Sequence, residues 1–499
     1  MLVKLTALGG LAVWLGWSTP GSAQMTTSPA PQGEALSEHY EVTVDGVAVP
    51  VYACRVSAEP FNQVWPGYQR PLDQTELAGF ACWDMTGPVS VEVRSLRPIE
   101  SVVVRPRASG IEPQVGGDRL RFTLDRPRRL VVEVNGPHHA LHLFAGSPES
   151  DVPAPDAPGV RYFGPGVHRP GRITLESNQT VYLAAGAVVY GSVQANGAEN
   201  IAVRGRGILD VSPFPRGEGG GAVRFADCRN IVIEGIVMRD PDVWCCSLFG
   251  CRNALIEGTK LVGLWRYNAD GIDVCNSQDV TIRDCFVRAF DDAIVLKGLK
   301  SQPTSFDDRP VSNVQVSGCT IWCDWGRALE IGAETCAPEF SDVVFQDCDI
   351  VRTTHIAMDI QHGDRALVRN IRFDNIRVEM EDPNPRPQFQ QSPEDRYAPT
   401  PDGDYLPALA VIVIQGTHYS KDDQRGSVRD VLFRNISVTA PRMPASSLQG
   451  FDAEHTVDGV TFEELRFNGE PLADAAEARV SVGGHVANVS FRASPDRGN

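Results

Sequence analysis

Three aspartates carry the clearest chemistry in this sequence. Asp270 lies in the segment Asn268–Asp273, and Asp291 and Asp292 form an adjacent pair in Phe290–Gly298. Carboxylates held close together cannot all ionise easily, so one keeps its proton near neutral pH while the others stay charged. The protonated group can protonate a leaving group, and a charged one can activate water. If the fold brings the three together, the pattern indicates hydrolysis of a glycosidic bond.

A loose repeat predicts the fold that would do so. From about residue 160, an Asn or Asp followed by alternating apolar residues recurs. Most steps lie between 23 and 34 residues, and one step of 60 contains a long insertion. The units begin at Asn200, Asn230, Asn253, Asp279, Asn313, Asp342, Asn370, Asp430, Gly459 and Asn488. A period-2 pattern without helical periodicity between units predicts a right-handed parallel β-helix. We expect each leading Asn or Asp to satisfy backbone groups at a corner of the coil.

A second set of strands would position the aspartates. These segments align as rungs of one sheet: Gly271–Cys275, Ala293–Lys297, Ala328–Gly332, Ala357–Gln361 and Val411–Gln415. With about 4.8 Å between adjacent strands, Asp270 would face the aspartate pair of the next coil. Because side chains alternate along a strand, Asp273, Glu330 and Asp359 are expected on the outer face beside them.

The twelve cysteines divide into two sets. Cys285, Cys319 and Cys348 each follow the leading residue of a unit at the position where other coils carry Ile, so we expect them to be interior rungs. Cys54 and Cys82 stand apart and could pair in an exported protein. Neither set has the Cys-x-x-Cys spacing of a zinc site.

A histidine cluster, His138, His139 and His142, precedes the expected linker. A metal site is one interpretation, but no other ligand signal accompanies the cluster, so we favour a structural role or a contact between domains. The sequence therefore implies no metal and no organic cofactor.

The 499-residue chain is long enough for a small domain and an elongated one. Residues 1–23 read as a signal peptide and residues 24–37 as a flexible leader. Short alternating strands predict an antiparallel β-sandwich at 38–148: Tyr40–Val44, Val91–Ser95, Ser101–Arg105, Leu120–Leu124 and Leu130–Val134. A proline-rich linker at 149–159 leads into the β-helix at 160–495.

The charge balance narrows the choice of partner. With 46 basic and 63 acidic residues, the formal charge is −17, which argues against a nucleic-acid or anionic-membrane partner. No later segment has the length of a membrane helix. We expect an exported protein, periplasmic or extracellular, whose partner is an oligo- or polysaccharide. The sequence leaves the oligomeric state open.

The order of motifs resembles a known family. Asn268–Asp270, Asp291–Asp292 and Gly326–Gly332 resemble the motifs of polygalacturonase-type glycoside hydrolases, family 28. The resemblance covers about residues 160–491, and the sandwich ahead of it is more similar to the dextranase group, family 49. It implies an inverting hydrolase on a right-handed β-helix, in which Asp291 is the general acid. Asp270 and Asp292 would position and deprotonate water.

The chain departs from family 28 where those enzymes bind an anionic sugar. Arg327 replaces the His of Gly-His-Gly, and Asp359-Ile-Gln361 replaces the Arg-Ile-Lys that grips a galacturonate carboxylate. A uronate would be repelled by Asp359, so we expect a neutral or weakly charged glycan. Arg327 and Lys297 keep a pectin-type, uronate substrate open, because either can pair with a carboxylate.

Aromatic and polar side chains near the rungs complete the predicted sugar-binding surface, since sugars stack on aromatic rings. The predicted substrate-binding residues are Trp265, Tyr267, Lys297, Trp325, Arg327, Glu330, Asp359, Gln361 and His362. His362 is preferred to His355, and Trp244 and Trp322 lie on the same loops; loop packing is the alternative for each Trp. The insertion between Glu381 and Ala408 is either a lid over one cleft end or a disordered loop.

Two other functions are compatible with the sequence. A polysaccharide lyase would use a base such as Arg327 beside a uronate carboxylate, although the crowded carboxylates argue against it. A non-catalytic glycan-binding β-helix would lose no function when Asp291 is replaced. We favour the hydrolase. The sugar, the linkage and the choice between endo and exo action stay open.

Overall fold

The structure, a computed structural model, describes residues 25–63, 69–300, 306, 309–381, 383–392, 394–399 and 405–492. The expected signal peptide at 1–23 and the last expected β-helix residues, 493–495, lie outside these ranges. Within these ranges no helix is long and apolar enough to cross a membrane.

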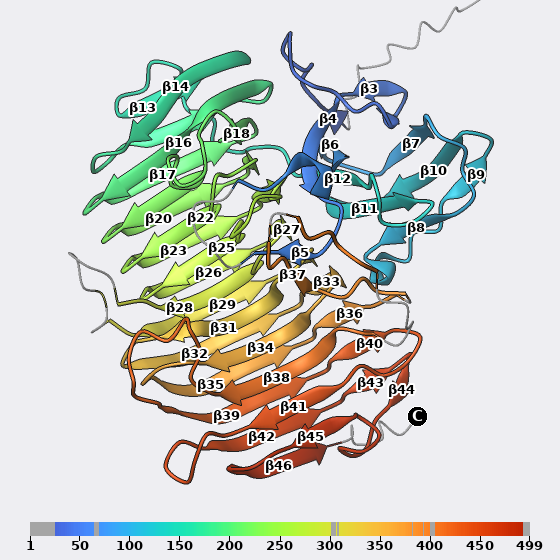
Figure 1. Cartoon of the computed structure of the whole chain (residues 1–499). Helices are drawn as coiled ribbons and strands as arrows, with labels where there is room; N and C mark the ends of the chain where they lie inside the picture. The colour runs from blue at the N-terminus through green and yellow to red at the C-terminus, as the bar shows by residue number, and fades with distance from the viewer. Residues whose placement is uncertain are drawn as a thin grey trace, which may run out of the picture.

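The first domain is a sandwich of two sheets that stands beside the β-helix (Figure 1). One sheet contains β1 (Met25–Thr26), β4 (Val51–Ser57), β6 (Thr75–Met85), β8 (Val102–Arg105), β11 (Arg128–Val134) and β12 (Leu141–Gly146). The other contains β2 (Tyr40–Val44), β3 (Val47–Val49), β7 (Val89–Ser95), β9 (Gln114–Gly116) and β10 (Arg119–Leu124). Two 3-10 turns, η1 (Leu72–Gln74) and η2 (Arg107–Ser109), lie in its loops. Pairing is antiparallel among the described strands, except that β12 runs parallel to β6.

A right-handed parallel β-helix follows, as the repeat predicts, and its coils stack from β13 to β46 (Figure 1). One face is a 12-stranded sheet. It contains β13 (Val160–Phe163), β15 (Thr180–Leu183), β17 (Glu199–Gly205), β20 (Arg229–Glu234), β23 (Arg252–Glu257), β26 (Gln278–Arg283), β29 (Val311–Ser317), β32 (Glu339–Gln346), β35 (Leu367–Asp374), β39 (Ser427–Arg434), β42 (Val457–Glu463) and β46 (Val486–Arg492).

A 21-stranded sheet forms the rest of the coil. It contains β14 (Gly166–Thr174), β16 (Ala187–Asn196), β18 (Ile208–Asp210), β19 (Val223–Ala226), β21 (Val237–Arg239), β22 (Cys246–Phe249), β24 (Lys260–Val262), β25 (Ile272–Cys275), β27 (Phe286–Ala289), β28 (Ile294–Gly298), β30 (Thr320–Cys323), β31 (Arg327–Thr335), β33 (Asp349–Thr353), β34 (Ile356–His362), β36 (Arg377–Glu379), β38 (Ala408–Ile414), β40 (Ser437–Thr439), β41 (Ser446–Gln449), β43 (Arg466–Phe467), β44 (Glu470–Pro471) and β45 (Val480–Val482). A further pair, β5 (Phe61–Asn62) and β37 (Gln388–Phe389), joins the sandwich to the insertion.

The leading residue of each repeat unit has a left-handed backbone. Asn200, Asn230 and Asn253 have φ angles of 57°, 56° and 56°, a region that Asn and Asp tolerate better than other non-glycine residues. Asn230 Nδ2 donates to Asn200 Oδ1, and Asn253 Nδ2 donates to Asn230 Oδ1, both at 2.9 Å. These bonds join side chains of successive coils, which differs from the expected bonds to corner backbone groups, because each coil places the same amide above the last.

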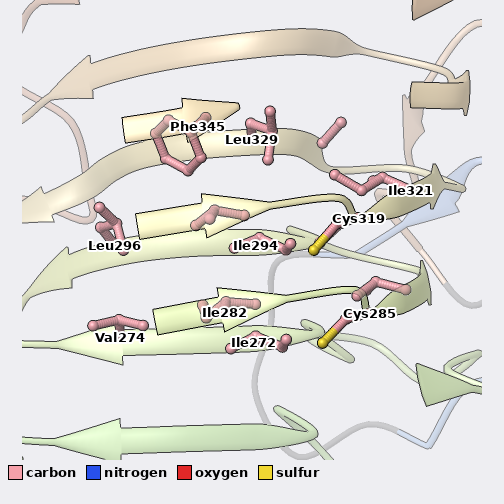
Figure 2. Packing of buried hydrophobic residues seen from close by; sticks show 14 of the residues in the cluster. Ile272, Val274, Ile282, Cys285, Ile294, Leu296, Cys319, Ile321, Leu329 and Phe345 are labelled. Atoms are coloured by element: carbon pink, nitrogen blue, oxygen red, sulfur yellow. The ribbon is translucent and has the colours of Figure 1, made fainter. Parts of the chain in front are cut away.

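The interior of the β-helix is a stack of apolar side chains (Figure 2). Ile272, Ile294 and Leu329 occupy successive rungs and are fully buried. Cys285 and Cys319 are also fully buried in this cluster, as is Cys348, so the prediction that these cysteines are interior rungs is confirmed.

The sequence left open whether Cys54 pairs with Cys82; in the structure all twelve cysteines are free. β4 places Cys54 opposite Ala78 of β6, whereas Cys82 lies further along β6, opposite Phe144 of β12. The two thiols therefore occupy different positions of one sheet, and neither forms a disulfide.

A separate apolar cluster holds the sandwich against the β-helix. Phe144 of β12 packs on Phe286 of β27, with ring centroids 4.9 Å apart. At the edge of this cluster, Arg352 of the β-helix forms an ion pair with Glu133 of β11, which also pairs with Arg105 at 3.1 Å. Burial of both apolar and charged groups therefore fixes the two domains together.

Residues 25–37, expected to be a flexible leader, instead contact both domains. β1 pairs with β6, with Met25 opposite Met85. Glu34 forms a 2.9 Å ion pair with Arg239 of β21, and the two side chains are only 2% and 8% exposed. A buried ion pair needs a fixed partner, so this segment is held in place.

Candidate active site

The parallel register brings the three aspartates together. β25 pairs with β28, with Ile272 opposite Ile294. Asp270 and Asp292 each lie two residues before these strands, so they occupy equivalent positions on adjacent coils. Backbone bonds tie these positions: Gly271 N–H donates to Asp292 O at 2.8 Å. The spacing of the aspartates in the sequence is thus one turn of the β-helix.

Gly326 on the next coil packs against the aspartate pair. A Cβ at this position would lie 2.5 Å from the carbonyl carbon of Asp291 and 2.6 Å from the amide nitrogen of Asp292. Gly326 N–H donates to Phe290 O at 3.1 Å. The glycine before Arg327 is therefore needed so that the backbone can support the two carboxylates from the following coil.

Lys297 of β28 lies among the aspartates and is 4% exposed. Its Nζ is 2.8 Å from Asp270 Oδ2, 3.5 Å from Asp273 Oδ1 and 3.6 Å from Asp292 Oδ2. Burial opposes the charge, but these carboxylates raise the pKa of Lys297 well above its ordinary value. Its charge is therefore already engaged by the protein.

Arg327 of β31 likewise lies beside several acidic side chains of the protein. Its side chain reaches Asp292 at 3.8 Å and Asp359 at 3.4 Å. It also lies 4.0 Å from Glu330 and donates to Gln361 Oε1 at 3.1 Å. Glu330 and Asp359, predicted as sugar contacts, are 0% and 1% exposed and thus lie beneath Arg327. Burial raises the pKa of Glu330 well above its ordinary value.

The adjacent aspartates have opposite pKa shifts. Burial, followed by repulsion from Asp292 and Asp270, raises the pKa of Asp291 well above its ordinary value. Burial disfavours the charge on Asp292 as well, but Lys297 and Arg327 outweigh it and hold the pKa of Asp292 below its ordinary value. These opposite shifts favour a protonated carboxyl on Asp291 beside an ionised carboxylate on Asp292, the pairing that acid–base hydrolysis requires.

Asp270 and Asp359 have pKa values that are raised by burial to a moderate extent. Burial raises the pKa of Asp270 to about 6, against the attraction of Lys297. Burial also raises the pKa of Asp359 to about 7, against the attraction of Arg327. Asp270 is therefore mostly ionised at neutral pH, whereas Asp359 exchanges its proton in that range.

Two residues predicted as sugar contacts, Trp265 and Tyr267, are instead buried inside the fold. Trp265 is 4% exposed, and its Nε1 donates to Asp240 Oδ1 at 2.8 Å. Tyr267 is 2% exposed, and its hydroxyl donates to Gln390 Oε1 at 2.8 Å. Both rings are buried and their polar atoms are hydrogen-bonded within the protein. They therefore pack beneath the loops and do not line a cleft.

Two further predictions, Trp325 and His362, are corrected for the same reason. Trp325 is 3% exposed, and its Nε1 donates to Gln388 O at 3.2 Å. His362 is fully buried, with Nδ1 2.9 Å from Thr335 Oγ1 and Nε2 2.6 Å from Ala366 O. Burial lowers the pKa of His362 to about 4, and neither ring nitrogen is available to a substrate.

The other aromatic and histidine candidates, Trp244, His355 and Trp322, lie in three different surroundings. Trp244 is half-buried, and Lys297 Nζ lies 4.2 Å from its ring centroid. His355, the less favoured histidine, faces Arg327 and Asp292; burial and then Arg327 lower its pKa to about 4. Trp322 instead belongs to the cluster between the domains.

The sequence analysis missed two neighbours of Asp291. Asn62, from the sandwich, donates through Nδ2 to Asp291 Oδ2 at 3.4 Å. Tyr419 follows β38, and the charges of Asp291 and Arg327 act on it, although burial is the main cause that raises its pKa to about 12. No motif marks either residue, because Asn62 lies in another domain and Tyr419 in an irregular loop.

The histidine cluster lies away from the aspartates. His138 Nδ1 is 2.8 Å from Glu76 Oε2, and His142 Nδ1 is 2.9 Å from Gly79 O. The His142 ring also contacts Phe286 of the β-helix at 5.1 Å. Within the described ranges, no group of three or more His, Cys, Asp or Glu side chains is arranged to hold a metal ion. The cluster thus occupies structural and interdomain positions.

The described part of the insertion spans both domains. Gln388 and Phe389 pair with Phe61 and Asn62, and Tyr405 OH donates to Thr354 O at 2.6 Å. Beneath it, a cavity of about 610 Å³ lies between the sandwich and the β-helix, lined by residues that include Arg105, Glu133, Arg288, Trp322, Tyr397 and Tyr405. The three aspartates do not line this cavity.

Residues 179–385, which include all three aspartates, match the family described as Glycosyl hydrolases family 28. The chain is similar to family 28 glycoside hydrolases. Curated relatives include a "Probable rhamnogalacturonase A" of Aspergillus oryzae, 24% identical over 31% of this chain and 30% of that protein. A probable polygalacturonase of Arabidopsis thaliana is 27% identical over 32% of this chain and 33% of its own length. The chain thus matches about a third of the length of each relative.

Solved structures confirm the resemblance at the level of the fold. Dex49A from Penicillium minioluteum superposes with a TM-score of 0.68 at 14% identity, covering 93% of this chain and 96% of its own. A hyperthermoactive exopolygalacturonase from Thermotoga maritima superposes with a TM-score of 0.50 at 17% identity, covering 67% of this chain and 84% of its own. The first match extends over the sandwich as well as the β-helix of this family 28-like chain.

Proposed function

We propose that this protein is an exported, periplasmic or extracellular, inverting glycoside hydrolase that cleaves a neutral or weakly charged glycan. The observation that carries the proposal is the opposite pKa shift of Asp291 and Asp292, together with Asp270 on the adjoining coil. The match to family 28 supports the same reaction class. The proposed export rests on the character of residues 1–23.

In the proposed mechanism, Asp291 gives its proton to the glycosidic oxygen as the bond to the anomeric carbon breaks. Asp270 and Asp292 hold a water molecule on the opposite face of the sugar. This water attacks the anomeric carbon, and its proton passes to one of the two carboxylates. The product has inverted configuration, and proton exchange with solvent restores Asp291 for the next cycle.

The neutral substrate is supported by the state of the two cations. Lys297 faces three carboxylates, and Arg327 faces Asp292, Glu330 and Asp359. A uronate carboxylate would have to displace carboxyl partners that already pair with the two cations inside the protein. Trp244, half-buried beside Lys297, offers a ring on which an uncharged sugar can stack.

A galacturonate-containing, pectin-type substrate is the second candidate, and the names of the curated relatives favour it. In that case Arg327 would exchange one of its carboxylate partners for the substrate. A reducing-sugar screen on both neutral and uronate-containing glycans separates the two candidates.

The test is a reducing-sugar screen on neutral and uronate-containing glycans, with the anomeric configuration of the first product followed by proton NMR. We expect wild type to release inverted product from a neutral glycan and Asp291→Asn to lose that activity at least a hundredfold. Asp279→Asn is the matched control, because Asn leads other coils at this position. Asp279 accepts from Asn313 through Oδ1 and forms an exposed ion pair with Arg252 through Oδ2.

Activity confined to uronates would overturn the neutral substrate. Retained configuration would overturn the inverting mechanism. An unsaturated, ultraviolet-absorbing product would identify a lyase. Full activity of Asp291→Asn would remove the aspartate from its role as general acid.

A further inference from the structure

The sandwich reaches into the candidate active site through one side chain. Asn62 is 4% exposed and lies at the end of β5, where its amide Nδ2 is 3.4 Å from Oδ2 of Asp291. Asp291 is itself only 7% exposed. Hydrogen bonds to catalytic groups are often long in a substrate-free site and shorten in the complex, so this contact is in range.

The orientation of the Asn62 amide is fixed by its neighbours. Its Oδ1 accepts the backbone N–H of Gln63 at 2.8 Å. Because an oxygen must occupy that position, the NH₂ group is the one that faces Asp291. The Asn62 backbone is held as well, since Gln390 N–H donates to Asn62 O at 2.7 Å and Gln388 N–H donates to Pro60 O at 2.9 Å.

A buried arginine braces the same segment against the β-helix. Arg70, 1% exposed, donates through Nη1 to Trp265 O at 2.8 Å and through Nε to Gln74 Oε1 at 3.1 Å. Its guanidinium lies 4.0 Å from the ring centroid of Phe290, the residue that immediately precedes Asp291. The sandwich therefore contacts both the side chain of Asp291 and the backbone turn that carries it.

We propose that Asn62 is a positioning residue that keeps the proton of Asp291 on Oδ1. The unprotonated oxygen of a carboxyl accepts an amide N–H more strongly than the hydroxyl oxygen does, so a donor fixed at Oδ2 favours Oδ1 as the protonated atom. The acid would then present its proton from one defined oxygen in every cycle. This inference rests on the proposed function for its catalytic meaning, but the protonation geometry stands on the contact alone.

Other charges also act on Asp291 and set the background for a test. Asp270, Asp292, Lys297 and Arg327 face it from the β-helix, with Arg216 and Tyr419 from flanking loops. A donated N–H favours the charged form of a carboxyl, so removal of the amide should raise the pKa of Asp291 while the other groups stay in place.

The experiment compares Asn62→Ala and the isosteric Asn62→Asp with wild type. For Asn62→Ala we expect kcat to fall about tenfold with KM within about twofold, and the alkaline limb of the kcat–pH profile to move to higher pH. Asn62→Asp keeps the shape of the side chain but replaces the N–H donor by a carboxylate. Its negative charge should raise the pKa of Asp291 more than Asn62→Ala does, so the alkaline limb should move to still higher pH. Asn135→Ala is the control, because Asn135 only bonds turn backbone in the sandwich; it should lower stability without moving the limb.

A second measurement needs no substrate. The carbonyl stretch of protonated Asp291 is defined by infrared difference between wild type and Asp291→Asn, and its loss is followed as pH rises. In Asn62→Ala the band should shift in frequency and persist to higher pH. If it does so while wild type cleaves no glycan, the proposed function fails and this inference stands. If wild type is active but neither the band nor the limb moves in either variant, the role of Asn62 is overturned and the proposed function stands.

Discussion

Lys297 Nζ lies 2.8 Å from Asp270 Oδ2, and the two side chains are only 5% and 2% exposed. Loss of one partner of a buried pair leaves the other charge uncompensated, which costs about 3–5 kcal/mol. We therefore expect Lys297→Met to lower the free energy of unfolding by about that amount at pH 7, measured by urea denaturation. Adding Asp270→Asn should restore part of the loss.

Lys421→Met is the control for that measurement. Its amine is 3.9 Å from Glu334 and its side chain is 36% exposed, so the change should cost no more than about 1 kcal/mol. Equal losses in Lys297→Met and Lys421→Met would contradict the buried ion pair.

Stability should fall as pH rises because of Asp359. The pKa of Asp359 is raised from 3.8 to about 7, first by burial, so the folded protein keeps a proton that the unfolded chain releases near pH 4. The unfolded state then binds fewer protons between about pH 4 and pH 7, and the free energy of unfolding decreases across that window. Asp359→Asn cannot ionise, so it should be about 2–4 kcal/mol more stable than wild type at pH 8.

Urea denaturation between pH 4 and pH 8 checks this prediction, with Asp342→Asn as a matched change. Asp342 has a φ of 57° in the ladder of leading residues, and Asn suits that conformation equally. Its pH profile should parallel wild type. A constant difference between Asp359→Asn and wild type at every pH would refute the raised pKa.

Trp244 and Trp325 should respond differently to truncation. Trp244 is half-buried beside Lys297, so Trp244→Ala should raise KM for a glycan about tenfold with little change in stability. Trp325 is 3% exposed within the core cluster, so Trp325→Ala should lower the free energy of unfolding by about 3–5 kcal/mol. Steady-state kinetics and urea denaturation of both variants distinguish glycan binding from core packing. A rise in KM for Trp325→Ala and a loss of stability for Trp244→Ala would contradict this assignment.

Thiol titration tests the state of the cysteines. All twelve are free and eleven of them are buried, so the folded protein should react slowly with a thiol reagent. After denaturation without reductant, we expect twelve reactive thiols. Ten would mean that a disulfide forms, and peptide mapping would show whether it joins Cys54 to Cys82.

Regular alternation made much of the fold predictable. The expected strand Tyr40–Val44 coincides with β2, and the expected rungs Asp273, Glu330 and Asp359 lie in one continuous register. Strands β4, β6 and β12 were not predicted. They face the sandwich core on one side and the β-helix on the other, so apolar residues occupy both faces and the period-2 signal is lost.

The candidate site was predictable only where it is local to the repeat. Asp270 precedes β25, and Asp291 and Asp292 precede β28 on the next coil, so their proximity follows from the stacking of neighbouring units. Asn62 reaches Asp291 only because two domains dock, and no periodicity encodes that contact. The buried Trp265 and Tyr267 failed as sugar contacts because a loop sequence does not reveal which way a ring turns.

Successive coils of the β-helix contact only their neighbours, and the three aspartates occupy two adjoining coils. Coupling between the acid pair and the C-terminal coils therefore passes through many intervening interfaces. Loops on distant coils, such as those around β43 to β45, are free to vary in length without moving Asp291. The stacked architecture thus allows the loops of one coil to change in length while neighbouring coils hold the backbone positions of Asp270, Asp291 and Asp292.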